Sequence, residues 1–289
     1  MHTTTLTPKG QFDLVAAIEF LRGFGPVDHN ESGDGHTLLL PLVVEGEWLP
    51  AVVEVSDVGD GDLAVTAHGP GAGNAAITQI RRVLSLELDP APFDKVCDAD
   101  PVLAEARGRH PVLRPVLFPS VYESLAWAIL SQRTRMASAS AAKARIAQTL
   151  GQVVDVSGEE VAVFPEPARL SSLEPMKGVT ETKAARLRGL AAAVVNDDVT
   201  AARIVAAPDA LEQLQQIDGV GPFSAELALV RGAGALDHLP GHEARLDAIV
   251  RDGYDLADDN KDGIAKVAEA WRPYRSWAAF LLRADAAGA

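Results

Sequence analysis

LEQLQQIDGVG, residues 211–221, decides the fold of this chain together with PFSAE, residues 222–226, which follows it directly. Apolar residues recur at helical spacing up to Ile217 and predict an amphipathic helix that ends at Gly219-Val220-Gly221, with a second helix immediately after it. The two glycines permit a tight turn. The amides of this turn and of the first helical turn after it, including Ser224, are then expected to point outward and bind an anion. An ordinary turn between helices is the alternative.

Composition places the chain among globular proteins. It has 289 residues, of which 47% are hydrophobic, and a mean hydropathy of +0.07, so it can bury one large core or two ordinary ones. No apolar run approaches the roughly 18 residues that span a bilayer, and the N-terminus lacks the pattern of a signal peptide. The single cysteine, Cys97, excludes an intrachain disulfide and a cysteine-ligated zinc or iron–sulfur cluster. We therefore expect a cytoplasmic protein that has no contact with a membrane.

The charge is distributed unevenly along the chain. Most of the net charge of −14 falls on residues 1–100, which carry 5 Lys and Arg against 16 Asp and Glu, whereas residues 101–289 carry 21 against 24. The nearly neutral second part can still present a basic face to nucleic acid, because binding responds to local potential rather than to total charge.

Two sequence patterns divide the chain. Residues 2–6 are extended in character, residues 12–22 predict a helix that stops near Gly23–Pro26, and residues 74–87 predict a second helix. Between them lie three β-rich runs, 36–44, 48–56 and 63–68, joined by the hairpin signals 45–47 and 58–61. From about Asp100 onward helical periodicity dominates and no convincing strand is expected. The boundary is predicted in the Pro- and Asp-rich stretch 89–112.

Four further segments, taken in order with the hairpin, carry a resemblance to a known family. They are YESLAWAILSQ (122–132), VFPEPARL (163–170), LPGHE (239–243) and WRPYRSWA (271–278). In this order the chain resembles a divergent member of the AlkA-type 3-methyladenine DNA glycosylases of the helix-hairpin-helix (HhH-GPD) superfamily. The resemblance covers nearly the whole chain, specifically in residues 112–289 and only architecturally in the first hundred.

The resemblance implies an architecture and an activity. It implies an AlkA N-terminal-like α+β domain over residues 1–100 and a mostly α-helical HhH-GPD glycosylase domain over residues 101–289. Such a protein flips a damaged or modified base out of double-stranded DNA and hydrolyses its N-glycosidic bond in base excision repair. It acts as a cytoplasmic, nucleoid-associated monomer without an organic cofactor and without side-chain metal ligands. A monovalent cation at the hairpin, bridging to phosphate, is the one ion implied.

At the catalytic position the chain departs from the family, which has an aspartate just after a Leu-Pro pair. Counting without a gap from Arg231-Gly232 places Glu243 there, whereas aligning on Leu239-Pro240 with a one-residue gap places His242 there. We prefer Glu243 as the catalytic residue, with His242 secondary, because only a carboxylate can oppose the positive charge that develops on the sugar. A glutamate that only complements the dipole of the following helix is the alternative.

The predicted base pocket consists of Phe223, Leu227, Tyr122, Trp127 and Arg283. Phe223 stands where lyase-competent relatives have a lysine, so no Schiff base and no cleavage at the abasic site are expected. Leu227 and Arg283 stand where the family has aromatic residues. Because cationic alkylated bases favour aromatic faces, these two departures favour a neutral lesion, or one with acceptors for Arg283. Core packing of Phe223 and a solvent-facing Arg283 are the alternatives.

The turn after residues 122–130 is predicted to enter the DNA. The family inserts a wedge residue there, so Gln132 and Arg133 are assigned to DNA binding, together with Gly219, Val220, Gly221 and Ser224. Three basic residues are candidate phosphate contacts: Arg135, Lys143 and Lys183. The aromatic residues Trp271, Tyr274 and Trp277 are assigned to the core. Arg275 is expected to pair with a buried carboxylate or with DNA.

Two other functions compete with the glycosylase. A catalytically inactive helix-hairpin-helix protein can bind distorted or damaged DNA, and the placement of Glu243 against a nucleotide-sized pocket distinguishes it from an enzyme. An acidic protein-interaction module on a repair scaffold would draw on the negative charge of residues 1–100. Salt-dependent DNA binding separates that module from the first two.

Overall fold

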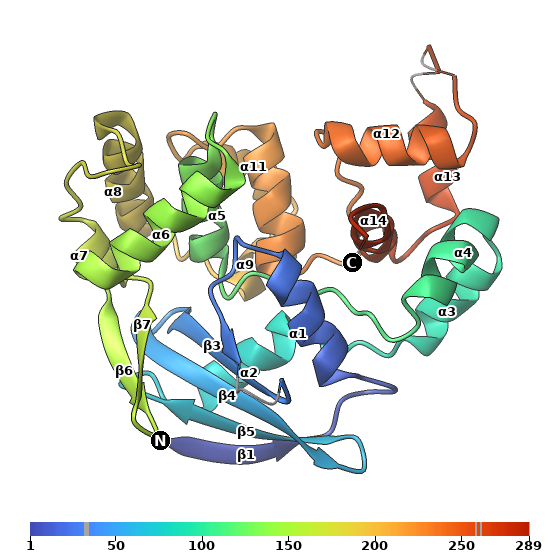
Figure 1. Cartoon of the computed structure of the whole chain (residues 1–289). Coiled ribbons are helices and arrows are strands. Elements are labelled where there is room, and N and C mark those ends of the chain that lie inside the picture. Colours follow the sequence, from blue (N-terminus) through green and yellow to red (C-terminus); the bar gives the residue numbers. More distant parts are fainter. Residues whose placement is uncertain (32–34, 258, 261, 289) are drawn as a thin grey trace.

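The computed structural model describes residues 1–31, 35–257, 259–260 and 262–288. A small antiparallel sheet lies at one end of the molecule, at the bottom of Figure 1, and helices make up most of the rest. The sheet is formed by β1 (His2–Leu6), β2 (Asn30–Glu31), β3 (Thr37–Val44), β4 (Leu49–Gly59) and β5 (Asp62–His68). Its strand order is β1-β5-β4-β3-β2, with every neighbouring pair antiparallel. The predicted meander of three strands is therefore confirmed, and β2 is added at its edge.

The helices follow in chain order and are named here with their bounds. They are α1 (Leu14–Gly23), α2 (Asn74–Val83), α3 (Ala91–Asp98), α4 (Pro101–Arg109), α5 (Val121–Ser131), α6 (Met136–Leu150), α7 (Pro167–Leu170), α8 (Glu181–Asn196), α9 (Ala201–Ala206), α10 (Ala210–Gln215), α11 (Pro222–Leu227), the π-helix η1 (Ala228–Ala233), α12 (Ala244–Gly253), α13 (Gly263–Glu269) and α14 (Arg275–Ala286). The predicted end of the first helix near Gly23 is confirmed.

Strand β3 explains how the sheet joins the helices. Its sequence, TLLLPLVV, is almost continuously apolar and is buried from Leu38 to Val44. Leu39 and Val43 belong to a hydrophobic cluster with α5, α8 and a second hairpin, whereas Leu38, Leu40 and Leu42 belong to a cluster with α1 and α2. A strand covered on both faces has apolar residues at successive positions rather than at alternate ones.

That second hairpin corrects the prediction that strands end near Asp100. Strands β6 (Gln152–Val156) and β7 (Glu159–Val163) form a two-stranded antiparallel sheet in the middle of the helical part. Val154, Val156, Val161 and Val163 are buried in the same cluster as Val43 of β3. Only the alternating valines of a five-residue strand signal it, and the surrounding helical periodicity obscures so short a run.

Helix α5 lies at the centre of the molecule and is buried on all sides. Ser120 caps it by accepting a hydrogen bond from the amide of Glu123 at 3.0 Å, and every residue from Val121 to Leu130 is buried. A helix that is apolar all round belongs to a core and not to a surface. The end of this helix therefore holds the next residues, Gln132 and Arg133, at a fixed place.

A third hydrophobic cluster joins distant parts of the chain. Phe93 of α3 and Leu103 of α4 pack with Trp271 and with Trp277 of α14, and both tryptophans have no exposed surface. Phe93 and Trp277 stack with ring centroids 4.3 Å apart. Figure 1 shows α3 and α4 on the same side of the molecule as α12, α13 and α14. The core assignment of Trp271 and Trp277 is confirmed, and the cluster spans the predicted boundary near residue 100.

A buried charge cluster connects α5, α6 and the segment after α1. The Lys143 ammonium has no exposed surface and lies 2.9 Å from a carboxylate oxygen of Asp28 and 3.5 Å from one of Glu123. Burial raises the pKa of Glu123 to about 7, although Lys143 opposes the shift. Lys143 therefore serves the core, and its prediction as a phosphate contact is wrong.

We expect Lys143→Met to lower the free energy of unfolding by about 3–5 kcal/mol, because it leaves a buried carboxylate without its partner. The loss should be larger at pH 8 than at pH 5, since Glu123 accepts a proton below about pH 7 and then needs no cation. Urea unfolding at both pH values measures this. Lys177→Met, at an exposed lysine, is the matched control, and an equal loss in the two variants would contradict the assignment.

Candidate active site and nucleic-acid interface

The hairpin between α10 and α11 holds its two glycines in different conformations. Gly219 has a φ of +85°, and a Cβ added to it would lie 2.5 Å from Cδ of Arg186. Gly221 caps α11 with φ −90° and ψ −179°, and a Cβ there would meet no atom within 4 Å. The predicted need for glycine is confirmed at residue 219. It is wrong at residue 221, because any residue adopts extended backbone.

The amides of the hairpin match the prediction in part. The amide of Val220 donates to the carbonyl of Ile217 at 3.0 Å. It is therefore not free to bind an anion, and the prediction is wrong for this amide. Within the described residues, the amides of Gly221, Phe223 and Ser224 donate to no acceptor. Free amides at the start of a helix attract an anion. The candidate anion site is therefore the start of α11.

Gln132 and Arg133, which follow α5, have different roles in the structure. Nε2 of Gln132 donates to the carbonyl of Gly219 at 2.6 Å, and its Oε1 accepts from Nη1 of Arg186 at 2.9 Å. Arg133 is exposed and has a φ of +51°. Its side chain makes no hydrogen bond or ion pair with the described part of the chain. Gln132 thus fixes the hairpin to α5, while Arg133 is free to reach a ligand.

The other predicted phosphate contacts, Arg135 and Lys183, differ in whether their side chains are free. Arg135 is exposed at the start of α6. Nζ of Lys183 donates to the carbonyl of Leu130 at 2.5 Å and to the hydroxyl of Thr134 at 2.6 Å, so this lysine closes the end of α5. Of the three predicted residues, Arg135 retains a free side chain facing solvent.

The predicted pocket residues divide between surface and core. Phe223 is 47% exposed, so the core-packing alternative does not describe it, and Leu227 is partly buried beside it on the same helix. Tyr122 has no exposed surface, and its hydroxyl donates to the carbonyl of Pro165 at 2.9 Å. Trp127 is 5% exposed within the sheet cluster. The pocket assignment is therefore wrong for Tyr122 and Trp127, because α5 is buried all round.

Glu226, one turn after Phe223 on α11, is a buried carboxylate that the sequence analysis missed. It accepts hydrogen bonds from the amides of Gly241 at 3.1 Å and His242 at 3.0 Å, and Nδ1 of His242 lies 3.0 Å from its Oε1. Burial alone raises the pKa of Glu226, but these hydrogen bonds together hold it below the ordinary value. The signal was the glutamate three residues after Phe223, which shares its helix face.

Glu243 and Arg283, two of the three positions at which the chain departs from the family pattern, form an ion pair. Glu243 caps α12, and its Oε1 accepts a hydrogen bond from Nε of Arg283 on α14. Both side chains are about one-third exposed or less, at 26% and 30%. Glu243 therefore lies at the expected helix start, and Arg283 is not simply solvent-facing.

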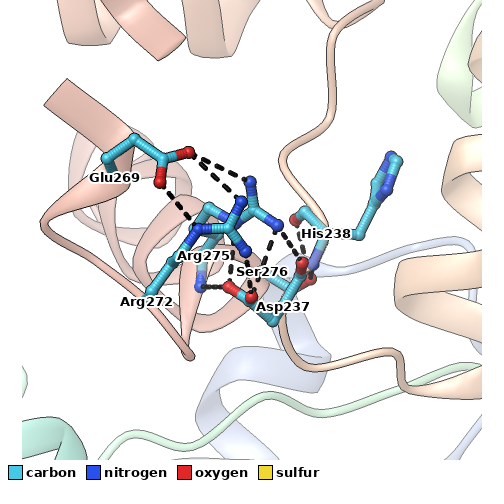
Figure 2. Close-up of polar contacts among 6 residues, drawn as sticks. All are labelled: Asp237, His238, Glu269, Arg272, Arg275 and Ser276. Atoms are coloured by element: carbon cyan, nitrogen blue, oxygen red, sulfur yellow. Dashed lines mark hydrogen bonds and ion pairs between the residues drawn. The ribbon is translucent and has the colours of Figure 1, made fainter. Parts of the chain in front are cut away.

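The loop that carries His242 and Glu243 is fixed to α14 by the contacts in Figure 2. The Asp237 carboxylate accepts from Nε of Arg275 at 2.8 Å and from Nη1 of Arg272 at 2.7 Å. The Ser276 hydroxyl donates to the carbonyl of His238 at 2.8 Å and accepts from its amide at 3.0 Å. Arg275 thus pairs with a partly buried carboxylate, the first of its two predicted alternatives.

His238 connects this anchored segment to Glu226. In Figure 2 its ring points away from the ion pairs, and its Nε2 lies 3.6 Å from Oε1 of Glu226. The loop is therefore held at Asp237 by arginines and at Gly241 and His242 by one carboxylate.

Arg231, of the Arg-Gly pair used to align the site, lies among three aromatic rings. Its guanidinium carbon is 4.5 Å from the ring centroid of Phe24, 5.0 Å from that of Phe280 and 5.5 Å from that of Phe20. Burial lowers the pKa of Arg231 to about 10. This cation–π cluster joins α1, η1 and α14 behind the candidate site.

Within the ranges that the structure describes, no group of three His, Cys, Asp or Glu side chains is arranged to hold a metal ion. None of the described helices combines the length and the apolar character of a membrane-spanning helix.

The chain is similar in sequence to known DNA repair proteins, although no protein-family model matches it. It is 24% identical over 213 residues to the DNA-3-methyladenine glycosylase of Bacillus subtilis, a match that covers 71% of this chain and 70% of that protein. It is 28% identical over 207 residues to a probable bifunctional transcriptional activator/DNA repair enzyme AlkA of Mycobacterium tuberculosis. That match covers 70% of this chain but only 41% of the longer protein.

Solved structures show the same fold. The 3-methyladenine DNA-glycosylase from Archaeoglobus fulgidus matches with a TM-score of 0.80 and 18% identity over 96% of both chains. The 8-oxoguanine glycosylase/lyase of Clostridium acetobutylicum, in complex with double-stranded DNA, matches with a TM-score of 0.72 and 15% identity, over 99% of this chain and 96% of that one. At these identities the likeness establishes the fold.

The two hairpin glycines should respond differently to substitution. Gly219→Ala should lower the free energy of unfolding by about 1–2 kcal/mol, because it forces a side chain into the left-handed region. Gly221→Ala should change it by less than about 0.5 kcal/mol, because its backbone is extended and its surroundings are open. Urea unfolding of both variants measures the difference, and similar losses would contradict the described hairpin.

Proposed function

We propose that this chain, a divergent member of the AlkA-type helix-hairpin-helix DNA glycosylases, flips a damaged base out of double-stranded DNA and hydrolyses its N-glycosidic bond. Its curated relatives are named as 3-methyladenine glycosylases or as DNA repair enzymes AlkA, which favours an enzyme over a binding-only protein. The proposed enzyme acts as a monomer on DNA.

The observation that carries the proposal is the convergence of three features on α11. Free amides suited to a phosphate lie at its start. Phe223 presents an exposed ring one turn before Glu226, as stacking on a flipped base requires. Glu226 in turn fixes the loop that carries His242 and Glu243. A phosphate site, a stacking surface and a pair of polar groups at one helix suit excision of an extruded base.

Glu243 is proposed to supply negative charge next to the sugar as the glycosidic bond breaks. A fixed carboxylate stabilises the oxocarbenium-like transition state of glycosyl cleavage. Its ion pair with Arg283 holds it in place but also reduces its net charge. The partly exposed guanidinium can at the same time donate to acceptors on a base. These contacts favour a neutral lesion with acceptor atoms over a cationic one.

Cleavage of the DNA strand is not part of the proposal. A lyase needs an amine that forms a Schiff base with the sugar. Phe223 stands at the first position after the hairpin proline, and Lys183 is engaged with α5. The proposed product is therefore an intact abasic site.

We also propose that the hairpin holds a monovalent cation through main-chain carbonyl oxygens. The carbonyls of Ile217 and Gly219 each accept one hydrogen bond, and a carbonyl oxygen has a second lone pair that can bind a cation. The cation would add positive charge where a phosphate binds.

Arg133 is proposed as the wedge that fills the space left by a flipped base. Arg133→Ala should weaken binding to duplexes with an abasic site or an extrahelical base more than binding to intact duplex, because only the former offer a gap. Arg135→Ala, at a neighbouring exposed arginine, should weaken binding to both by a similar factor. Fluorescence anisotropy measures the affinities, and equal losses for Arg133→Ala would make it a phosphate contact instead.

A screen of labelled duplexes with single lesions tests the function itself. We expect strand breaks only after alkali treatment, because base release leaves an abasic site. Glu243→Gln should slow single-turnover release by about 100-fold, the scale for removing one electrostatic stabiliser, while binding of an abasic duplex stays intact. Tight binding of damaged duplexes without release from any lesion would instead support a binding protein, and breaks without alkali would contradict the absence of lyase activity.

A further inference from the structure

His242 is the second polar group of the loop, and one of its ring nitrogens is left free by the structure. Nδ1 lies 3.0 Å from Oε1 of Glu226. Nε2 has no partner within the described residues, and 55% of the side chain is exposed. The imidazole is thus fixed at one edge and open at the other.

Glu226 determines which nitrogen carries the proton. Its buried carboxylate accepts hydrogen bonds from two amides, and these contacts together with His242 hold its pKa below the ordinary value. An ionised carboxylate only accepts hydrogen bonds. Nδ1, which lies 3.0 Å from Oε1 of this carboxylate, is therefore assigned as the protonated nitrogen, and in the neutral imidazole Nε2 then has the free lone pair.

We propose that His242 is the general base that activates the water attacking the sugar, and that Glu226 is the residue that positions it. This inference rests on the proposed glycosylase function and adds a residue that the family pattern does not have. The two neighbouring residues then have different roles. Glu243, paired with Arg283, stabilises the positive charge on the sugar, and His242 accepts a proton from the water. The exposed ring of Phe223 lies one turn before Glu226 on α11, so the proposed stacking surface and the carboxylate that contacts this imidazole belong to one helix.

The proposed step balances as a hydrolysis. The bond from C1′ to the base nitrogen breaks, and its electron pair leaves with the base. The oxygen of water bonds to C1′, and the proton that this water loses goes to Nε2. The imidazolium, stabilised by the Glu226 carboxylate, then passes its proton to the departing base or to solvent.

The proposed role of His242 as a base predicts the direction of a pH effect. The charged or titratable groups that face it are Glu226 on α11, His238 in the same loop, and the Glu243–Arg283 ion pair beside it. A base works only when unprotonated, so the rate of base release should fall on the acidic side of the profile.

His242→Asn is the decisive variant, because the asparagine amide can donate to Glu226 in place of Nδ1 but offers nothing in place of Nε2. On a lesion that the wild-type protein excises, we expect an about 100-fold slower release, loss of the acidic limb, and unchanged affinity for abasic duplex. Glu226→Gln should give a smaller loss. His2→Asn, in β1 of the sheet, is the matched control. Nitrogen NMR of the imidazole should show the proton on Nδ1 in the wild type and a loss of that preference in Glu226→Gln.

The outcomes separate the two proposals. Release by His242→Asn at the wild-type rate, with the acidic limb retained, would overturn the role of His242 and leave the glycosylase function standing. A proton on Nε2 in the wild-type imidazole would overturn the positioning role of Glu226. No release by the wild-type protein from any lesion would overturn the glycosylase function and the base assignment with it.

Discussion

The complete burial of α5 is the constraint on which the rest of the structure depends. Every residue from Val121 to Leu130 is buried, so the sheet, the β6–β7 hairpin and the surrounding helices all pack on this one helix. The contacts of Lys183 with Leu130 and Thr134 fix the end of the helix. Gln132 extends from it to the carbonyl of Gly219, which fixes the hairpin relative to the core.

A second constraint acts on the loop between η1 and α12. Arg272 and Arg275 hold it at Asp237 (Figure 2), and the buried Glu226 holds it at Gly241 and His242. A buried carboxylate needs several donors to offset its desolvation. The loop supplies two of those donors, the amides of Gly241 and His242. The same hydrogen bonds that stabilise the Glu226 carboxylate therefore also position His242. Charge at the site therefore depends on contacts between α11, α12 and α14.

Two departures from the family pattern become one feature in the structure. Counted without a gap from Arg231-Gly232, Glu243 falls where the resembled family has an aspartate, and Arg283 falls where that family has a tryptophan. The two side chains form an ion pair. Forty residues separate them in the chain, so spacing along the sequence carries no sign of their contact. In the sequence each is a separate replacement of a family residue, with no sign of a partner. Together they place a carboxylate and a guanidinium in contact at the start of α12.

The sequence by itself determined the hairpin, the meander of β3, β4 and β5 and the burial of the tryptophans, because each depends on residues close together in the chain. It also carried the resemblance to AlkA-type glycosylases, through the order of five short motifs. Turn chemistry, alternation and helix ends are local physics. Only the tertiary structure decided that β6 and β7 form within the helical part, that Tyr122, Trp127 and Lys143 belong to the core, and that Glu226 holds His242. The reason is that burial and ion pairing depend on which distant residues become neighbours. A lysine that appears solvated in the sequence becomes a core residue when Glu123 and Asp28 lie beside it, and a glutamate becomes a site residue when a loop fifteen residues away folds back onto it.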